Sequence, residues 1–184
     1  MRAQSFRALA VALALVLPMV NSSPVFAASA SELNAASKKA LNKLVAEVPA
    51  AKALNSKAIA VLVFPSITKA GFMVGGQFGE GVLYKGGKPV GYYNTGGASY
   101  GLQAGAQQYG YAMFFMTQKG LNALNAQQGF EVGVGPSVVV VDEGMAKTAT
   151  TTTMTGDVYA FVFGQKGLMA GVGIQGNKIT RIKK

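Results

Sequence analysis

The sequence contains GFMVG at residues 71–75, GLQAG at 101–105, GFEVG at 129–133 and GLMAG at 167–171. Each segment has Gly at both ends, Phe or Leu second, and Val or Ala fourth. Because successive side chains of a strand point to opposite faces, the two apolar residues share one face of a strand. Helices are disfavoured, since each interior Gly costs about 1 kcal/mol. The repeats therefore predict strands in which glycine permits bends, bulges or close backbone approach.

Strands and turns are expected through the rest of residues 58–184. They are placed at 58–64, 79–84, 89–93, 109–116, 137–141, 157–163, 168–174 and 178–182, with one helix within 117–128 and either a strand or a loop at 148–155. Pro65 is expected to end the first strand, and Lys85-Gly86-Gly87-Lys88 to form a hairpin turn. The predicted fold class is α+β and β-dominated. N-terminal helices would pack on a strongly curved, mainly antiparallel, Gly-rich sheet that resembles a barrel or sandwich.

Residues 28–57 are predicted to be helical. Ser29 and Glu32 have the spacing of a capping box, and Pro49 would end the first helix before a second, short one at 50–56. Apolar residues recur at helical spacing, and the polar side carries lysines. Two interpretations stay open and are compatible: a helix packed on the β body with solvated lysines, or a basic surface that lies against a membrane.

The N-terminal residues 1–27 have the pattern of a secretory signal peptide. Arg2 and Arg7 precede an uncharged apolar run, and cleavage is expected after Ala27; an uncleaved anchor is the alternative. Residues 28–57 would form a helical lead and 58–184 a Gly-rich β body, with 28–184 making one domain. We expect an exported protein of a bacterial periplasm or exterior, peripherally associated with the membrane.

The composition excludes several kinds of chemistry. The chain has no Cys and no His, so it has no disulfide, no thiolate metal site and no Ser-His-Asp triad. It is therefore predicted not to be an enzyme and to use no metal or cofactor, and Glu80 is expected to be solvated or salt-bridged. The formal net charge is +10 at pH 7. Because the protein is expected outside the cell, anionic phospholipid is a better partner for this charge than nucleic acid.

Lipid binding requires cations for the head group and an apolar surface for the chains. The candidate residues are Lys38, Lys39, Lys43, Lys52, Lys57 and Lys69 for the first, and Leu41, Leu44 and Phe72 for the second. Ordinary core packing is the competing interpretation of the apolar three. The C-terminal residues Lys178, Arg181, Lys183 and Lys184 form a second basic cluster, for which a solvated end is the alternative interpretation.

Three blocks of the chain resemble the SYLF lipid-binding domain, a family that includes yeast-type actin-binding members. They are AIAVLVFP at 58–65 with KAGF at 69–72, GASYGLQAGAQ at 97–107, and VYAF at 158–161 with KGLMAGV at 166–172. The resemblance implies a lipid-binding module that is not an enzyme. Eukaryotic relatives bind phosphoinositides and some bind actin, whereas secreted bacterial relatives are commonly single domains behind a signal peptide.

The sequence thus predicts a secreted or periplasmic SYLF-type protein. It would associate with anionic membrane lipids through a basic amphipathic helix and apolar lining. Actin is set aside as a partner, because no SH3 or FYVE-like segment accompanies the domain. The alternative is a small integral outer-membrane β-barrel or a structural envelope protein, since the length permits eight strands. An enzyme that uses Tyr, Lys or Glu is a third hypothesis.

Overall fold

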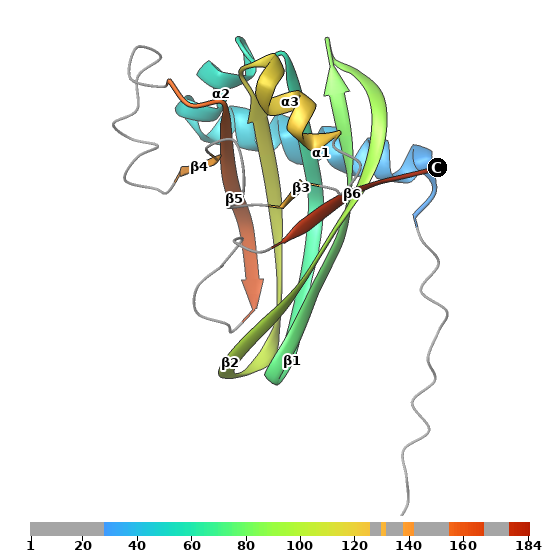
Figure 1. The fold of residues 1–184 in the computed structure, drawn as a ribbon, viewed down its shortest axis with the longest axis vertical. Helices are drawn as coiled ribbons and strands as arrows, with labels where there is room; N and C mark the ends of the chain where they lie inside the picture. The colour runs from blue at the N-terminus through green and yellow to red at the C-terminus, as the bar shows by residue number, and fades with distance from the viewer. Residues whose placement is uncertain (1–27, 126–129, 132–137, 142–154, 168–176) are drawn as a thin grey trace, which may run out of the picture.

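The computed structural model describes residues 28–125, 130–131, 138–141, 155–167 and 177–184. The predicted signal peptide at 1–27, the strand at 168–174 and most of the 148–155 tract lie outside these ranges, as do most of the glycine segments at 129–133 and 167–171. The elements are α1 (Ala30–Glu47), α2 (Pro49–Asn55), β1 (Ala60–Lys85), β2 (Lys88–Phe115), α3 (Gln118–Leu124), β3 (Phe130–Glu131), β4 (Val138–Val141), β5 (Val158–Gly167) and β6 (Lys178–Ile182). Figure 1 shows α1 lying across the upper part of the strands.

The helical lead is confirmed. The Ser29 hydroxyl accepts from the Glu32 amide while the Glu32 carboxylate accepts from the Ser29 amide, so both halves of the capping box are present. Pro49 stands at the start of α2, where its missing N–H costs no helical hydrogen bond. None of the helices in the described ranges is long and apolar enough to cross a membrane.

A long antiparallel ribbon of β1 and β2 dominates the molecule. The pairing extends from Ala60 opposite Phe115 to Lys85 opposite Lys88. The predicted turn is confirmed, and Gly86 and Gly87 have φ of 57° and 75°. Positive φ at both central residues belongs to the type I′ turn, whose twist matches that of the flanking strands.

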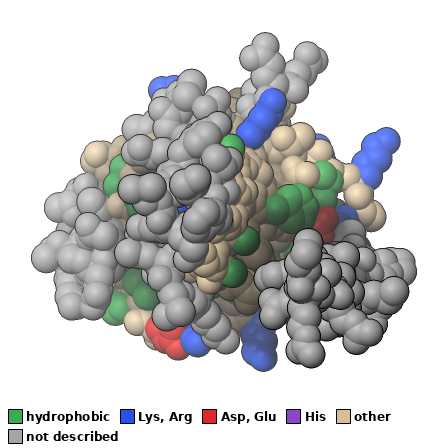
Figure 2. All heavy atoms as spheres, turned by 90° about the horizontal axis from the view of Figure 1, so that it is seen from below, with side chains coloured by type: hydrophobic (Ala, Val, Ile, Leu, Met, Phe, Trp, Pro, Cys, Tyr) green, Lys and Arg blue, Asp and Glu red, His purple; other side chains and the backbone are tan. Residues whose placement is uncertain are grey.

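The ribbon turns back on itself at the lower end of Figure 1. Two of the four glycine segments meet near this bend, because Gly71 is opposite Gly105 and Met73 is opposite Gly101. The register shifts between Gly71 and Met73, which is the irregularity expected of a bend. Figure 2, viewed from below, shows apolar side chains in the middle of the visible surface and Lys or Arg side chains projecting around them.

Pro65 does not end the first strand, contrary to the prediction. The chain continues as β1, and the register with β2 shifts between Phe64 and Ile67, so that Pro65 and Ser66 lie in an irregularity of the pairing. Proline is tolerated at such a bulge because its missing N–H removes no ladder hydrogen bond there.

The sheet is mainly antiparallel, but the barrel- or sandwich-like curvature predicted for it is wrong. Its strand order is β3-β6-β2-β5-β4, with β1 paired to β2, and only β4 and β5 are parallel. Over the described residues the sheet is neither closed nor strongly curled. The physical reason is that the glycines act locally. They permit the bend of the ribbon and the close approach between the two arms of β1, the parts of the strand before and after the bend.

Both faces of the sheet are buried in its upper part. Leu62 and Phe64 point into a core with β6 and α3, whereas Val61 and Val63 point into a second core under α1 and α2. This explains why the AIAVLVF run shows no apolar–polar alternation. The segment belongs to a central strand that is covered on both sides.

Glycine at position 81 is required by packing. A Cβ there would lie 2.6 Å from Phe64 Cδ1 and 2.7 Å from the Val63 carbonyl oxygen. Because a backbone atom cannot move aside easily, we expect Gly81→Ala to lower the free energy of unfolding by about 2 kcal/mol. Gly76→Ala is the matched control, since its Cβ would meet nothing closer than 3.9 Å. Urea denaturation of both variants checks the prediction, and equal losses would contradict it.

Candidate functional site: a cationic groove beside α1

A groove of about 460 Å³ lies between α1 and the strands β1, β2 and β5. On its α1 side it is lined by Lys39 and Lys43, which are one helical turn apart and therefore on one helix face. Apolar groups complete it, notably Pro65 from the β1 irregularity and Phe163 from β5. The groove thus combines two cations with an apolar lining.

Three features of the sequence create this groove. Leu33 and Leu44 are buried against the sheet and fix the rotation of α1. The Tyr84 hydroxyl donates to the Asn34 carbonyl over 3.0 Å, which fixes its position along the strands. Gly110 leaves space for the Phe163 ring, which a Cβ at this position would strike.

The electrostatics of the groove are simple. Lys39 and Lys43 are exposed, and the only ion pair described for them joins Lys43 Nζ to Glu47 over 3.8 Å in a well-hydrated position. Such pairs contribute little, so both charges are available to a ligand. Tyr109 also lines the groove, and burial raises its pKa to about 12, so its hydroxyl is neutral and donates to Gln77 over 2.7 Å.

The structure brings only some of the predicted residues together. Lys39 and Lys43 line the groove; Lys38, Lys52 and Lys57 are exposed, and Lys69 is half-buried, outside its lining. Leu44 is 2% exposed in the core, and Leu41 packs half-buried against the same core. Phe72 lies in β1, but its side chain is outside the described atoms. The roles of these residues in lipid binding stay predictions.

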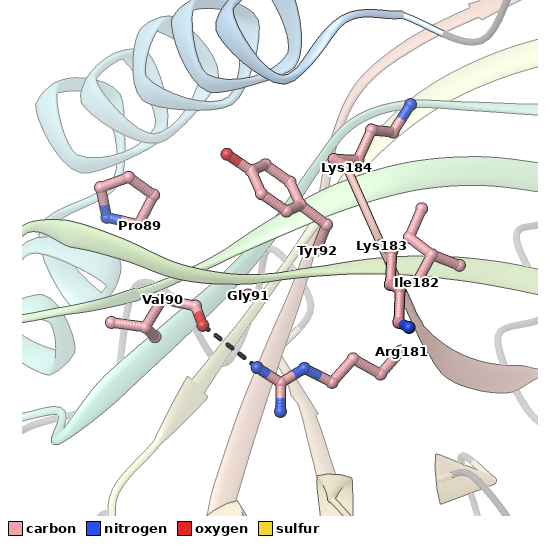
Figure 3. Close-up of a pocket in the computed structure, with 8 residues that line it drawn as sticks. All are labelled: Pro89, Val90, Gly91, Tyr92, Arg181, Ile182, Lys183 and Lys184. Atoms are coloured by element: carbon pink, nitrogen blue, oxygen red, sulfur yellow. Dashed lines mark hydrogen bonds between the residues drawn. The ribbon is translucent and has the colours of Figure 1, made fainter.

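A second groove, which the sequence interpretation missed, lies where β2 begins and β6 ends. It has a volume of about 770 Å³ and is lined by Pro89, Val90, Gly91, Tyr92, Arg181, Ile182, Lys183 and Lys184 (Figure 3). The basic C-terminal cluster was visible in the sequence. Its position became clear only through the pairing of Tyr92 with Ile182, which brings the two chain segments together.

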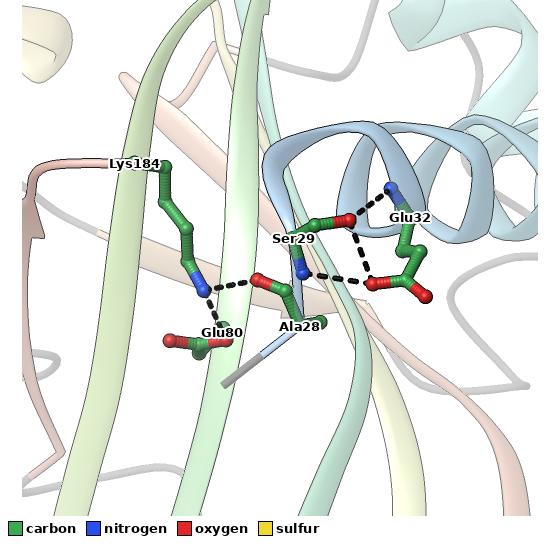
Figure 4. Close-up of polar contacts among 5 residues, drawn as sticks. All are labelled: Ala28, Ser29, Glu32, Glu80 and Lys184. Carbon is green, nitrogen blue, oxygen red and sulfur yellow. Dashed lines mark hydrogen bonds and ion pairs between the residues drawn. The ribbon is translucent and has the colours of Figure 1, made fainter. Parts of the chain in front are cut away.

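Lys184 connects the end of the chain to the start of α1. Its Nζ lies 2.8 Å from the Glu80 carboxylate and 2.5 Å from the Ala28 carbonyl oxygen (Figure 4). The two side chains are only 8% and 16% exposed. Glu80 is therefore salt-bridged, as the sequence predicted. In the part of the chain that the structure describes, no group of three His, Cys, Asp or Glu residues could hold a metal ion.

Comparison with known families gives one match. Residues 96–184 match the family model described as Ysc84, Las17-binding protein actin regulator. The match includes β6 and the residues of β2 and β5 that line the α1 groove, whereas α1 precedes it. No curated protein matches the chain. The resemblance stated from the sequence is confirmed.

The Glu80–Lys184 pair is expected to stabilise the fold. Glu80→Gln leaves a poorly hydrated ammonium facing a neutral amide, which should lower the free energy of unfolding by about 1–2 kcal/mol. Glu47→Gln removes the exposed partner of Lys43 and should cost less than about 0.5 kcal/mol. Urea denaturation of the two isosteric variants measures this difference. A loss for Glu47→Gln as large as that for Glu80→Gln would refute the assignment.

Proposed function

We propose that the protein is exported and binds anionic membrane lipids, because residues 96–184 match the model of the SYLF family, a family of non-catalytic binding domains. The family is associated with lipid and with actin binding. We propose lipid and not actin as the partner, because a signal peptide directs a protein to a membrane for export. The attachment is peripheral and takes place at the bacterial envelope.

The observation that carries this proposal is the groove beside α1. An anionic lipid offers a charged head group and apolar chains side by side. Lys39 and Lys43 stand next to Pro65 and Phe163 in the same arrangement. Each lysine near an anionic membrane surface contributes about 1 kcal/mol of binding free energy.

The burial of α1 indicates how the helix would meet the membrane. Leu44 and Leu33 are held in the core, so the helix does not need to leave the sheet. Its exposed lysines face outward while its apolar side stabilises the fold. The two interpretations of the helix therefore combine: one face packs on the β body, and the other approaches the head groups.

The proposal predicts that lipid binding depends on the position of the lysines and not on total charge. Lys39→Gln with Lys43→Gln should weaken binding to vesicles of phosphatidylglycerol and phosphatidylcholine by about thirtyfold, from a loss of about 2 kcal/mol. Lys52→Gln with Lys57→Gln removes the same charge from exposed positions outside the groove, and should weaken binding less. Vesicle co-sedimentation measures both, and added salt should weaken binding by the unmodified protein.

Two outcomes would count against this function. Equal loss in both double variants would show that only net charge matters. Salt-insensitive binding to purely zwitterionic vesicles would show that the lysines are not the determinant.

Export predicts a defined start of the processed chain. Cleavage after Ala27 leaves Ala28 first, next to the capping residue Ser29. Intact mass and N-terminal sequencing of the protein recovered from a bacterial periplasm should give this start. Recovery of residues 1–27 on the exported protein would contradict the prediction and favour an uncleaved anchor.

A further inference from the structure

Arg181 lies between two hollows at the edge of the sheet. One is the groove of Figure 3, which we call the β2–β6 groove; the other is a pocket of about 260 Å³ next to α3, which we call the Arg181 pocket. Val90 and Arg181 line both, so the two spaces adjoin. The β2–β6 groove is separate in its lining from the groove beside α1.

The Arg181 pocket is cationic. Lys85 and Arg181 both line it, and no Asp or Glu is among its lining residues. Its polar wall is already satisfied: the Tyr93 hydroxyl donates to Asn125 Oδ1 over 2.8 Å, and Asn125 Nδ2 donates to the Leu121 carbonyl over 3.1 Å. No acid of the pocket lining neutralises Lys85 and Arg181, so these two side chains are the groups whose charge is available to an anionic ligand.

The guanidinium of Arg181 has N–H donors that no described residue accepts. Among the described residues its one hydrogen bond runs from Nη2 to the Val90 carbonyl oxygen, over a long 3.4 Å (Figure 3). A guanidinium carries five N–H donors in a planar fork that matches two oxygens of a phosphate. Lys184, by contrast, is already occupied by Glu80 and Ala28.

An apolar strip begins beside these cations. Val90 is 46% exposed although it is a large apolar residue, and Pro89 and Ile182 line the same groove. Lys183 adds a further positive charge to that groove. The arrangement complements a molecule that carries an anionic group next to an apolar segment.

We propose that Arg181 and Lys85 bind the phosphate group of an amphiphile whose apolar part lies along Pro89, Val90 and Ile182. The inference rests on the proposed function in taking a membrane phospholipid as the source of that phosphate. It assigns a second site, at the opposite end of the β2 strand from the residues that line the α1 groove.

A soluble phospholipid tests the site without a membrane. Dihexanoylphosphatidylglycerol, below its micelle concentration, is titrated into the unmodified protein and variants by calorimetry, and backbone amide shifts are followed by NMR. Arg181→Gln should weaken binding about tenfold or more, because it removes a charge-assisted bidentate contact. Lys85→Gln should weaken it several-fold. Lys119→Gln is the matched control and should bind as the unmodified protein does, because its side chain is exposed and lines neither space. The shifts should centre on Val90, Gly91 and Arg181.

Two further ligands separate the chemistry of the site. Dihexanoylphosphatidylcholine should bind several-fold more weakly, because its choline cancels the phosphate charge. Inorganic phosphate should also bind more weakly, because it lacks the apolar part. Phosphate binding as tight as that of the phospholipid would overturn the amphiphile assignment and leave a site for free phosphate.

The assignment fails if Arg181→Gln leaves phospholipid affinity unchanged, or if the amide shifts map to the groove beside α1. Should Arg181→Gln fail to fold, Arg181→Lys replaces it, since that variant keeps the charge and loses the fork; unchanged affinity overturns the proposal and a several-fold loss supports it. The proposed function is judged separately, by the effect of the Lys39 and Lys43 changes on vesicle binding, so either can fail alone.

Discussion

The close approach between the two arms of β1 is the constraint on which the rest of the structure depends. Gly79 and Gly81 lie directly against the backbone and side chains of Val63 to Ile67, where any Cβ would collide with a carbonyl oxygen. This contact holds the folded ribbon together. It lets one strand, β2, pair with β6 along its first half and with β5 along its second. The β2–β6 groove lies where β6 pairs with the first half of β2, and the groove beside α1 lies where β5 pairs with the second half.

A buried polar contact supports the same arrangement. The Gln77 side chain, on the returning arm of β1, accepts from the Tyr109 hydroxyl and donates to Asn177, just before β6. All three residues are at most 6% exposed. Since an unpaired polar group in such a place costs about 1–3 kcal/mol, this contact specifies one relative position of the two arms and β6. Burial raises the pKa of Tyr109 and Tyr111, which keeps both hydroxyls neutral in this interior.

Local features of this fold could be predicted, and pairings between distant segments could not. The capping box at Ser29, the restart at Pro49 and the Gly86-Gly87 turn depend on residues a few positions apart, so the sequence was sufficient. The glycine segments at 71–75 and 101–105 correctly indicated bent strands. They were over-interpreted as uniform curvature, because a glycine that permits a bend and one that makes space for Phe64 look the same in a sequence. Lys39 and Lys43 were among the predicted site residues. The pocket beside Arg181 could not be predicted, because it exists only through the register of β6 on β2.

The distribution of charge follows from how the few carboxylates are used. Four acidic side chains are described, and each has a partner: Glu32 caps α1, Glu47 and Glu80 pair with Lys43 and Lys184, and Asp157 accepts from Thr117 and lies 3.6 Å from Lys119. Among the described residues, the Arg181 pocket has no carboxylate in its lining, and Glu47, which pairs with Lys43 at the groove beside α1, is well hydrated. Both places therefore combine positive charge with accessible apolar surface, and a cationic cleft attracts anionic ligands from a distance.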